Sequence, residues 1–202
     1  MGLLDLIRGG KGLRKPSRIR HRGERLAQIL EAHRNHFLGK PGGKRADLRE
    51  ADLSLADLRH ANLAGAILEG AKLEGANLQQ AKLTHASLAG AHLRGADLRN
   101  TDMTEADLRG ADLSEAQASG VEFFRCDLSN ADFRRANLRN ANFRSANIRG
   151  AQFTGADMGV TILRETNLEG VDLSGVDLTT TLLPKGYTPP VAPAATRGPR
   201  RS

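Results

Sequence analysis

Residues 96–115 read ADLRN TDMTE ADLRG ADLSE, four units of five residues, each with a small first residue and a leucine or methionine third. The same unit extends in both directions without an insertion, from Ala46 to Thr180, for 27 consecutive units. The third or central residue is Leu, Ile, Met or Phe in 26 units, and the exception is Ala118. The first residue is Ala in 20 units and Thr, Val or Cys in the others. Internal repetition of this kind decides the fold before local propensity does.

A period of five residues fits neither regular element. On an α-helix, at roughly 100° per residue, successive central leucines would spiral away from any one face. On a flat strand an odd period would send them alternately to opposite faces. The first and third residues can point inward in every unit only if the chain turns once per unit. The repeat therefore predicts a coil in which each unit forms one side.

The glycines indicate how many sides close one coil. Two residues after the central residue, Gly occurs in two series, at 70, 90, 110, 150 and 170 and at 75, 95, 155 and 175. Both series advance in steps of 20, although Gly65 and Gly120 fall outside them. Because Gly adopts left-handed backbone conformations at little cost, we interpret each series as one recurrent corner. Four units then make one coil.

The pattern A(D/N)LXX resembles the pentapeptide-repeat family, and it covers about two thirds of the chain. This resemblance implies an all-β solenoid, a right-handed quadrilateral β-helix, with the central residue and the preceding alanine inside. Coils that stack at the strand spacing of ~4.8 Å would form a rod of roughly 30 Å from about seven coils.

The large side chains agree with such a core. One internal ladder would contain Leu48, Leu68, Leu88, Leu108, Leu128, Ile148 and Leu168. The four phenylalanines Phe123, Phe133, Phe143 and Phe153 would alternate between two opposite sides. Ala118, the short central residue, immediately precedes the side that carries Phe123, as expected for a core of constant volume. Cys126 occupies a small inward position, so we interpret it as a core residue and not as a reactive thiol.

Composition divides the chain into four segments. Residues 1–22, rich in Gly and Arg, are predicted to be a flexible basic arm. Residues 23–45 are predicted to contain a capping helix and a linker, because apolar residues recur at helical spacing from Gly23 to Leu38 and a Gly- and Pro-rich stretch follows. Residues 46–183 form the repeat. Residues 184–202, with five prolines, are predicted to be a disordered basic tail.

Charge is divided between the same segments. The net charge is +9 for residues 1–45, −6 for residues 46–183 and +4 for residues 184–202. An acidic body thus carries two basic ends. No apolar stretch is long enough to span a membrane, and the single cysteine excludes an internal disulfide, so we expect a cytoplasmic protein.

The search for reaction chemistry predicts no catalytic residues, no cofactor and no metal site. His33 and His36 are three residues apart, but no third ligand is evident. The outward acids before the central residues form columns on a convex rod, where they cannot face each other across a cleft. We expect them to bond neighbouring backbone groups at the corners.

An arginine belt is the candidate interaction surface. It comprises Arg125, Arg134, Arg135, Arg139, Arg144 and Arg149, and residues 125–149 carry a net charge of +4. It adjoins residues 94–122, whose net charge is −4. The two belts either neutralise each other between stacked coils or bind a partner.

Three functional hypotheses follow. The first is a non-catalytic protein-interaction module with an unknown protein partner. The second rests on the resemblance: some pentapeptide-repeat proteins mimic duplex DNA and protect DNA gyrase from quinolones. The arginine belt and the basic tails distinguish this chain from them. The third is non-specific binding of nucleic acid or another anionic surface by the tails. A weak homodimer through the C-terminal coil is also predicted, with a folded-back lid from Pro184 to Thr196 as the alternative.

Overall fold

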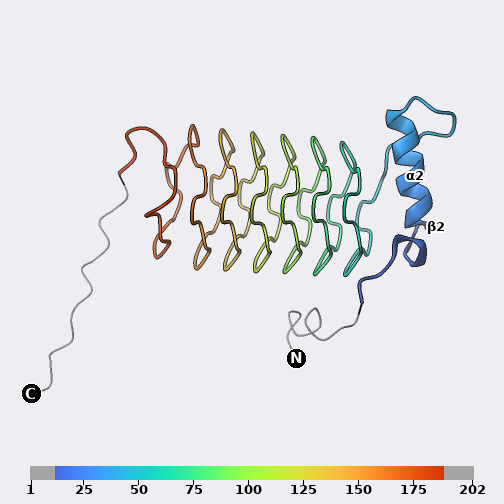
Figure 1. Ribbon diagram of the computed structural model, residues 1–202, viewed down its shortest axis with the longest axis horizontal. Coiled ribbons are helices and arrows are strands. Elements are labelled where there is room, and N and C mark those ends of the chain that lie inside the picture. Colours follow the sequence, from blue (N-terminus) through green and yellow to red (C-terminus); the bar gives the residue numbers. More distant parts are fainter. Residues whose placement is uncertain (1–11, 189–202) are drawn as a thin grey trace, which may run out of the picture.

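The computed structural model describes residues 12–188, and its dominant feature is a row of stacked coils with a helix at one end (Figure 1). Each coil joins the next through parallel β-bridges between residues 20 positions apart. The first bridge of each ladder is Asp47–Ile67, Asp52–Lys72, Asp57–Asn77 or Asn62–Lys82. Four ladders confirm four sides per coil. We number them by their first units: side 1 begins at residue 46, side 2 at 51, side 3 at 56 and side 4 at 61.

The β-structure of the solenoid consists of single-residue bridges. Because the chain bends at the fourth and fifth residue of each unit, only the second residue meets the bridge geometry. In the described range 12–188, the β-strands proper are β1 (Arg20–His21) and β2 (Glu24–Arg25), which lie outside the repeat. The all-β prediction therefore holds as ladders of bridges and not as extended strands, and right-handedness stays a prediction.

The unit 106–110 shows why the repeat has this composition, since all five of its backbone N–H groups are bonded. Three of them donate to carbonyls of neighbouring coils: Asp107 to Ala86 at 3.0 Å, Leu108 to Asp127 at 2.7 Å and Gly110 to Ser129 at 2.9 Å. Ala106 N–H donates across the preceding corner to Met103, at 2.9 Å. The last, Arg109 N–H, donates to the Asp107 carboxylate at 3.1 Å. An Asp or Asn before the central residue thus satisfies the one donor that the coils leave free.

The corners differ from the sequence prediction. The fifth residue of every unit from 50 to 175 has a positive φ, between 55° and 72°, whether or not it is glycine. All four corners therefore share one left-handed conformation, and the interpretation of the glycine series as special corners was wrong. The prediction of 20 residues per coil, drawn from the step between glycines, was nevertheless confirmed. Glycine is preferred at these corners but is not required. Asn, Glu, His and Arg also adopt the left-handed conformation there, at a cost of ~1–2 kcal/mol.

Val160 is the least suitable of these corner residues. It is β-branched, it has φ of 60°, and its side chain is 43% exposed, so packing does not repay the strain. We expect Val160→Gly to raise the free energy of unfolding by ~1 kcal/mol, measured by urea denaturation. Asn140→Gly, at a corner of the same side with φ of 58°, is the control and should change stability by less. An equal gain in both variants would contradict the strain argument.

The core contains one continuous cluster of phenylalanine rings. Phe123 and Phe143 belong to side 4, with centroids 4.8 Å apart, while Phe133 and Phe153 stack on side 2 at 5.2 Å. The alternation between opposite sides is confirmed. The rings also meet across the core, since Phe123 and Phe133 lie edge to face at 5.6 Å. Ala118 is fully buried, so the space beside these rings is filled without a large central residue.

Polar side chains in the small inward positions all donate to the same kind of acceptor, a main-chain carbonyl of the preceding coil. The hydroxyl groups of Thr101, Thr161, Thr166 and Thr181 each donate to the carbonyl 23 residues earlier, at 2.6 to 2.9 Å. The Cys126 thiol makes the same contact with Met103, at 2.8 Å. Cys126 is buried, and burial raises the pKa of its thiol to about 12. The core interpretation of this cysteine is confirmed.

The residues before the repeat are more ordered than predicted. A 3₁₀ helix, η1 (Pro16–Arg18), is followed by the hairpin of β1 and β2, which turns at Arg22 and Gly23 with φ of 47° and 86°. Both positive values are typical of a two-residue hairpin turn. Arg14 pairs with the first coil, donating to Leu55 O at 2.7 Å and accepting from Asp57 N–H at 2.9 Å. The flexible-arm prediction is therefore wrong for residues 12–22, and residues 1–11 lie outside the described residues.

The helix α2 (Leu26–Phe37) lies over the first coil (Figure 1). It begins three residues later than the apolar pattern suggested, because Gly23 to Arg25 belong to the hairpin. Leu26 and Ile29 are buried with Ile19 against the core of the solenoid. Ile19, an apolar residue among basic ones, explains why this segment packs: its burial removes apolar surface from water at the open end of the rod.

The last coil is held more loosely than the others. Side 4 keeps its bonds, with Leu163 N–H to Leu182 O and Leu182 N–H to Thr161 O both at 2.8 Å. Side 2 keeps the bridge between Gln152 and Asp172. On sides 1 and 3, among the described residues, the backbone donors that face residues 166–180 make no backbone hydrogen bond to that coil. Tyr187 packs against the core cluster, but Leu182 stays 39% exposed. The homodimer stays a prediction, and the predicted lid lies partly beyond residue 188.

Candidate functional site

The arginine belt is distributed around the rod. Arg125 and Arg144 belong to side 4, Arg134 and Arg135 to side 2, Arg139 to side 3 and Arg149 to side 1. Because each side faces a different direction, no single partner surface can contact all six. The belt predicted from the sequence is thus a ring, and the structure brings together only the pair on side 4 and the adjacent pair on side 2.

Four of the six arginines form ion pairs. Arg134 pairs within its own unit with Asp132 at 2.6 Å, whereas Arg144 reaches Glu165 in the next coil at 2.8 Å. Arg125 contacts Glu105 at 3.5 Å, and Arg139 contacts Asp157 at 3.4 Å. Within residues 12–188, Arg135 and Arg149 form no such pair. The arginine side chains of the four pairs are 51% to 62% exposed, so each pair contributes ~0–1 kcal/mol.

The acidic belt of residues 94–122 is neutralised both within units and between coils. Asp97 and Asp107 each accept both hydrogen bonds of a forked contact from the arginine two residues later, as Asp132 does in the arginine belt. Glu105 and Glu115 instead pair with Arg125 and Arg94 of neighbouring coils. The hydrogen bonds from Arg109 hold the pKa of Asp107 below its usual range. The sequence predicted charge compensation between stacked coils as one of two alternatives. The structure shows ion pairs between coils and also ion pairs within single units. A net charge summed over 29 residues cannot reveal the pairs within units.

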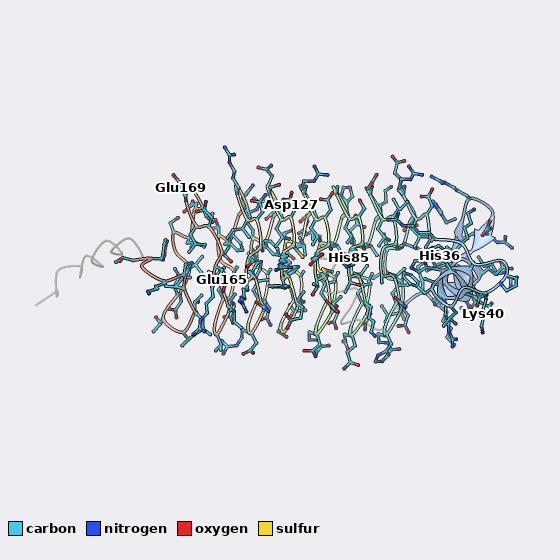
Figure 2. The ribbon with its side chains drawn as sticks, turned by 90° about the horizontal axis from the view of Figure 1, so that it is seen from above. His36, Lys40, His85, Asp127, Glu165 and Glu169 are labelled. Carbon is cyan, nitrogen blue, oxygen red and sulfur yellow. The ribbon has the colours of Figure 1, made fainter. Side chains whose placement is uncertain are left out.

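Arg149 borders a shallow hollow on side 1, at the loosened last coil. Asn130 and Asn147 line it from the preceding coils, and Asn167 and Glu169 line it from the last one. Figure 2 shows Glu169 and Asp127 along one edge of the rod in that view, while His85 and Glu165 lie nearer its midline. The hollow presents one cation, one carboxylate and several amides, which is a polar surface without convergent acid–base geometry.

Side 4 contains a feature that the sequence analysis missed. In residues 46–183 only four large apolar side chains occupy the second or fourth, outward positions of a unit: Ile67, Phe124, Ile162 and Leu182. Three of them lie on side 4, at its C-terminal half. The guanidinium of Arg125 lies 4.9 Å from the centroid of the Phe124 ring, within the range of a cation–π contact. Sorting the outward residues by side would have shown this cluster.

His33 is the one completely buried histidine of the described chain, and it joins the cap to the first coil. Its Nδ1 accepts a hydrogen bond from Ala46 N–H at 3.1 Å, so the neutral ring carries its proton on Nε2. Nε2 has no hydrogen-bond partner. Burial is the main cause that lowers the pKa of His33; the backbone of Ala64 opposes this shift in part, and the nearby His36 and Arg45 lower the pKa further. His21, in the hairpin, also has a lowered pKa, mainly through burial.

These lowered pKa values predict a cap that loosens in acid. In the unfolded chain a histidine takes up its proton near pH 6.5, whereas His33 in the folded chain resists protonation to a lower pH. The stability of the cap is therefore complete above about pH 6.5 and falls as the pH drops below it. Hydrogen exchange of α2 measured at pH 7.5 and pH 5, corrected for intrinsic rates, should show the loss.

His33→Gln keeps an acceptor for Ala46 N–H but does not titrate, so it should remove most of this pH dependence. His21 accounts for the remainder. Unchanged pH dependence in the variant would show that other groups control the cap.

No group of three or more metal-binding side chains occurs among residues 12–188. His36 lies beside Phe37, with ring centroids 5.7 Å apart. None of the helices in the described part of the chain has the length and apolar character that a membrane span requires.

Comparison with known proteins identifies the repeat. A family model for pentapeptide repeats matches residues 44–80, 76–115, 122–159 and 161–183, with eight copies. The chain is 30% identical to HetL, a pentapeptide repeat protein involved in heterocyst differentiation regulation in the cyanobacterium Nostoc sp. strain PCC 7120. That match covers 58% of this chain and 72% of HetL, with a TM-score of 0.34.

Two further solved structures are similar. A second pentapeptide repeat protein of Nostoc PCC 7120 is 26% identical over 80% of this chain and 87% of its own, with a TM-score of 0.31. QnrB1, a plasmid-mediated fluoroquinolone resistance protein, is 19% identical over 64% of this chain and 78% of its own, with a TM-score of 0.33. No curated protein sequence matches significantly. Because the family model matches well over half of the chain, the protein belongs to the pentapeptide repeat family.

Proposed function

We propose that this protein is a non-catalytic interaction module, a stiff rod that presents fixed rows of side chains to a protein partner. One observation carries the proposal. The backbone of the regular coils is bonded from coil to coil, as in the unit 106–110, so outward side chains are held at defined spacing along the rod. A pre-organised surface of this kind lowers the entropic cost of binding.

The surface carboxylates support a binding role over an acid–base role. Asp97, Asp107 and Asp132 are occupied by backbone N–H groups and arginines. Arginine contacts of this kind keep such carboxyl groups ionised well below neutral pH, and they lower the pKa of Asp107 in this way. A general acid near neutral pH needs the opposite shift.

The interaction role is tested by affinity capture from the cells that produce the protein, at low and high salt. We expect a partner that the wild type retains and that a variant with all six belt arginines changed to Ser releases. Both proteins should have the same circular dichroism spectrum, which shows that release is not unfolding. Equal retention by the two proteins would show that the belt is not the contact surface.

The alternative is a DNA mimic that protects DNA gyrase. The local pairing of acids with arginines weighs against it, because a mimic of duplex DNA needs rows of free negative charge. We therefore expect stoichiometric protein to leave supercoiling by gyrase unchanged, with and without a quinolone, in a gel assay. Inhibition or protection would favour the mimic.

Binding of anionic surfaces by basic residues at the ends is the other alternative. Residues 1–11 and 189–202 lie outside the described residues, while Arg14, packed against the first coil, pairs with Asp52 at 3.2 Å. An electrostatic contact of this kind should weaken steeply with salt and disappear when residues 1–22 and 184–202 are removed.

A further inference from the structure

The C-terminal half of side 4 presents an apolar column beside a basic column. Ile162 and Leu182 are consecutive second residues, joined by a β-bridge, and Leu182 is 39% exposed. Phe124, Arg144 and Arg164 are consecutive fourth residues. Their order is shown by Arg125 N–H, which donates to Arg144 O, and by Ser145 N–H, which donates to Arg164 O. We call Phe124, Arg144, Ile162, Arg164 and Leu182 the side 4 stripe.

The stripe is basic as well as apolar. Arg125 lies at a corner of the same side and Lys185 lies in the turn after Leu182, so four cations accompany the two acids Glu122 and Glu165 in this half of it. Arg144 remains 51% exposed in its pair with Glu165, and Arg164 forms no ion pair within residues 12–188. A half-buried aromatic ring and exposed arginines next to aliphatic side chains are the composition of a protein-binding centre.

The stripe departs from the composition that the coil itself favours. Asp or Asn in the second position accepts the N–H of the fourth residue, as in the contact from Arg144 N–H to Asn142 at 3.0 Å. Ile162 cannot accept, and Arg164 N–H makes no hydrogen bond in the described structure. Ile162 is half-buried at an outward position, and its presence there costs a turn bond that most units make. A residue that departs from the pattern of its own repeat at such a cost is the expected sign of a functional position.

We infer that the side 4 stripe binds an extended acidic segment of a partner protein, with apolar side chains between its carboxylates. The carboxylates would pair with Arg144 and Arg164, and the apolar side chains would cover Phe124 and Ile162. Three coil spacings separate the ends of the stripe, roughly 15 Å, which corresponds to about four or five extended residues. Residues 189–202 of this chain do not fit, because they contain three arginines and no acid. The inference rests on the proposed interaction role.

The direct test measures fluorescence anisotropy of a labelled peptide, Glu-Leu-Glu-Phe-Glu-Leu-Glu, with the full-length protein at low salt. We expect saturable binding with a Kd of ~10–100 μM, since so small a footprint gives weak affinity. The counterpart with lysine in place of glutamate should not bind. Equal binding of both peptides would overturn the inference.

Matched variants separate this side from the rest of the belt. Arg144→Ser with Arg164→Ser removes two charges from side 4, and Arg134→Ser with Arg139→Ser removes two from sides 2 and 3. We expect the first pair to weaken peptide binding ~10-fold or more and the second to change it less than ~2-fold. Equal losses of peptide affinity in the two double variants would show general attraction to a basic protein and would contradict a binding site on side 4.

A second variant removes the apolar part without harming the coil. Phe124→Ser with Ile162→Asn installs residues that the repeat itself uses in these positions. The introduced amide at position 162 can accept the Arg164 N–H, as Asn142 does for Arg144. The melting temperature should therefore stay the same or rise while peptide binding is lost. Retained binding would contradict the role of the apolar column.

Two results distinguish failure of the stripe from failure of the interaction role. A cellular partner that is retained by Phe124→Ser/Ile162→Asn but lost with the six-arginine variant would keep the interaction role and overturn the stripe. A wild-type dimer in sedimentation equilibrium that this double variant abolishes would show that the occupant is a second copy, which also overturns the acidic-segment inference.

Discussion

Leu98→Asp is expected to unfold the solenoid cooperatively. Leu98 is the central residue of a middle unit and is completely buried, with its N–H bonded to Gln117 O at 2.8 Å. The loss of the buried leucine costs ~1.5–3 kcal/mol, and an unpaired charge in the core costs several more. This sum is comparable to the whole stability of a domain of this size. Thermal unfolding by circular dichroism should show a melting temperature lowered by tens of degrees or no folded state.

The neighbouring residue is the control. Arg99 points outward and pairs with Asp97 at 2.7 Å, where its side chain is 52% exposed. Arg99→Ala should lower stability by no more than ~1 kcal/mol. Equal melting temperatures for the two variants would refute the inward assignment of the central residues.

Phe123→Ala is expected to have the second-largest effect. Its ring contacts Phe133 and Phe143, with centroids 5.6 and 4.8 Å away, and is completely buried. Removal of the ring leaves a cavity that the bonded coils cannot collapse around, at a cost of ~3–5 kcal/mol. Urea denaturation of the wild type and the variant measures this difference.

Phe124→Ala is the matched control, because the two rings are adjacent in sequence but only Phe123 points inward. Phe124 is half-buried on the surface and contacts Arg125. Its removal should cost ~1 kcal/mol or less. Similar losses in the two variants would show that the core near residue 123 adapts, contrary to the picture of a cluster of packed rings.

The repeat by itself makes the coil predictable. A period of five with small and apolar residues at fixed places has one physical solution, a chain that turns once per unit, and the step of 20 in the glycines indicated four sides. The prediction worked although its premise about glycine was wrong. All corners from 50 to 175 have positive φ, so glycine is one of several residues found at a corner and does not distinguish one side of the coil from another. Periodicity survives such an error because it averages over many units.

The cap was harder to predict. Helical spacing of apolar residues indicated a helix, but Gly and Arg before it were interpreted as a flexible arm. Burial of Ile19 and pairing of Arg14 with Leu55 and Asp57 depend on the open end of the first coil, which residues 12–22 do not encode locally. Edge pairing is a tertiary property, since an exposed row of backbone groups binds whatever segment is near.

Sequence alone determined the repeat and the inward positions, because five-residue periodicity and residue type act locally in each unit. The tertiary structure alone decided which charges are neighbours. Winding the chain four units per coil placed the six belt arginines on all four sides and set Arg144 against Glu165, 21 residues away. The same winding gathered Phe124, Ile162 and Leu182, distant in sequence, on one side. Net charge over a stretch of sequence cannot show this, because neighbours on a solenoid are 20 residues apart.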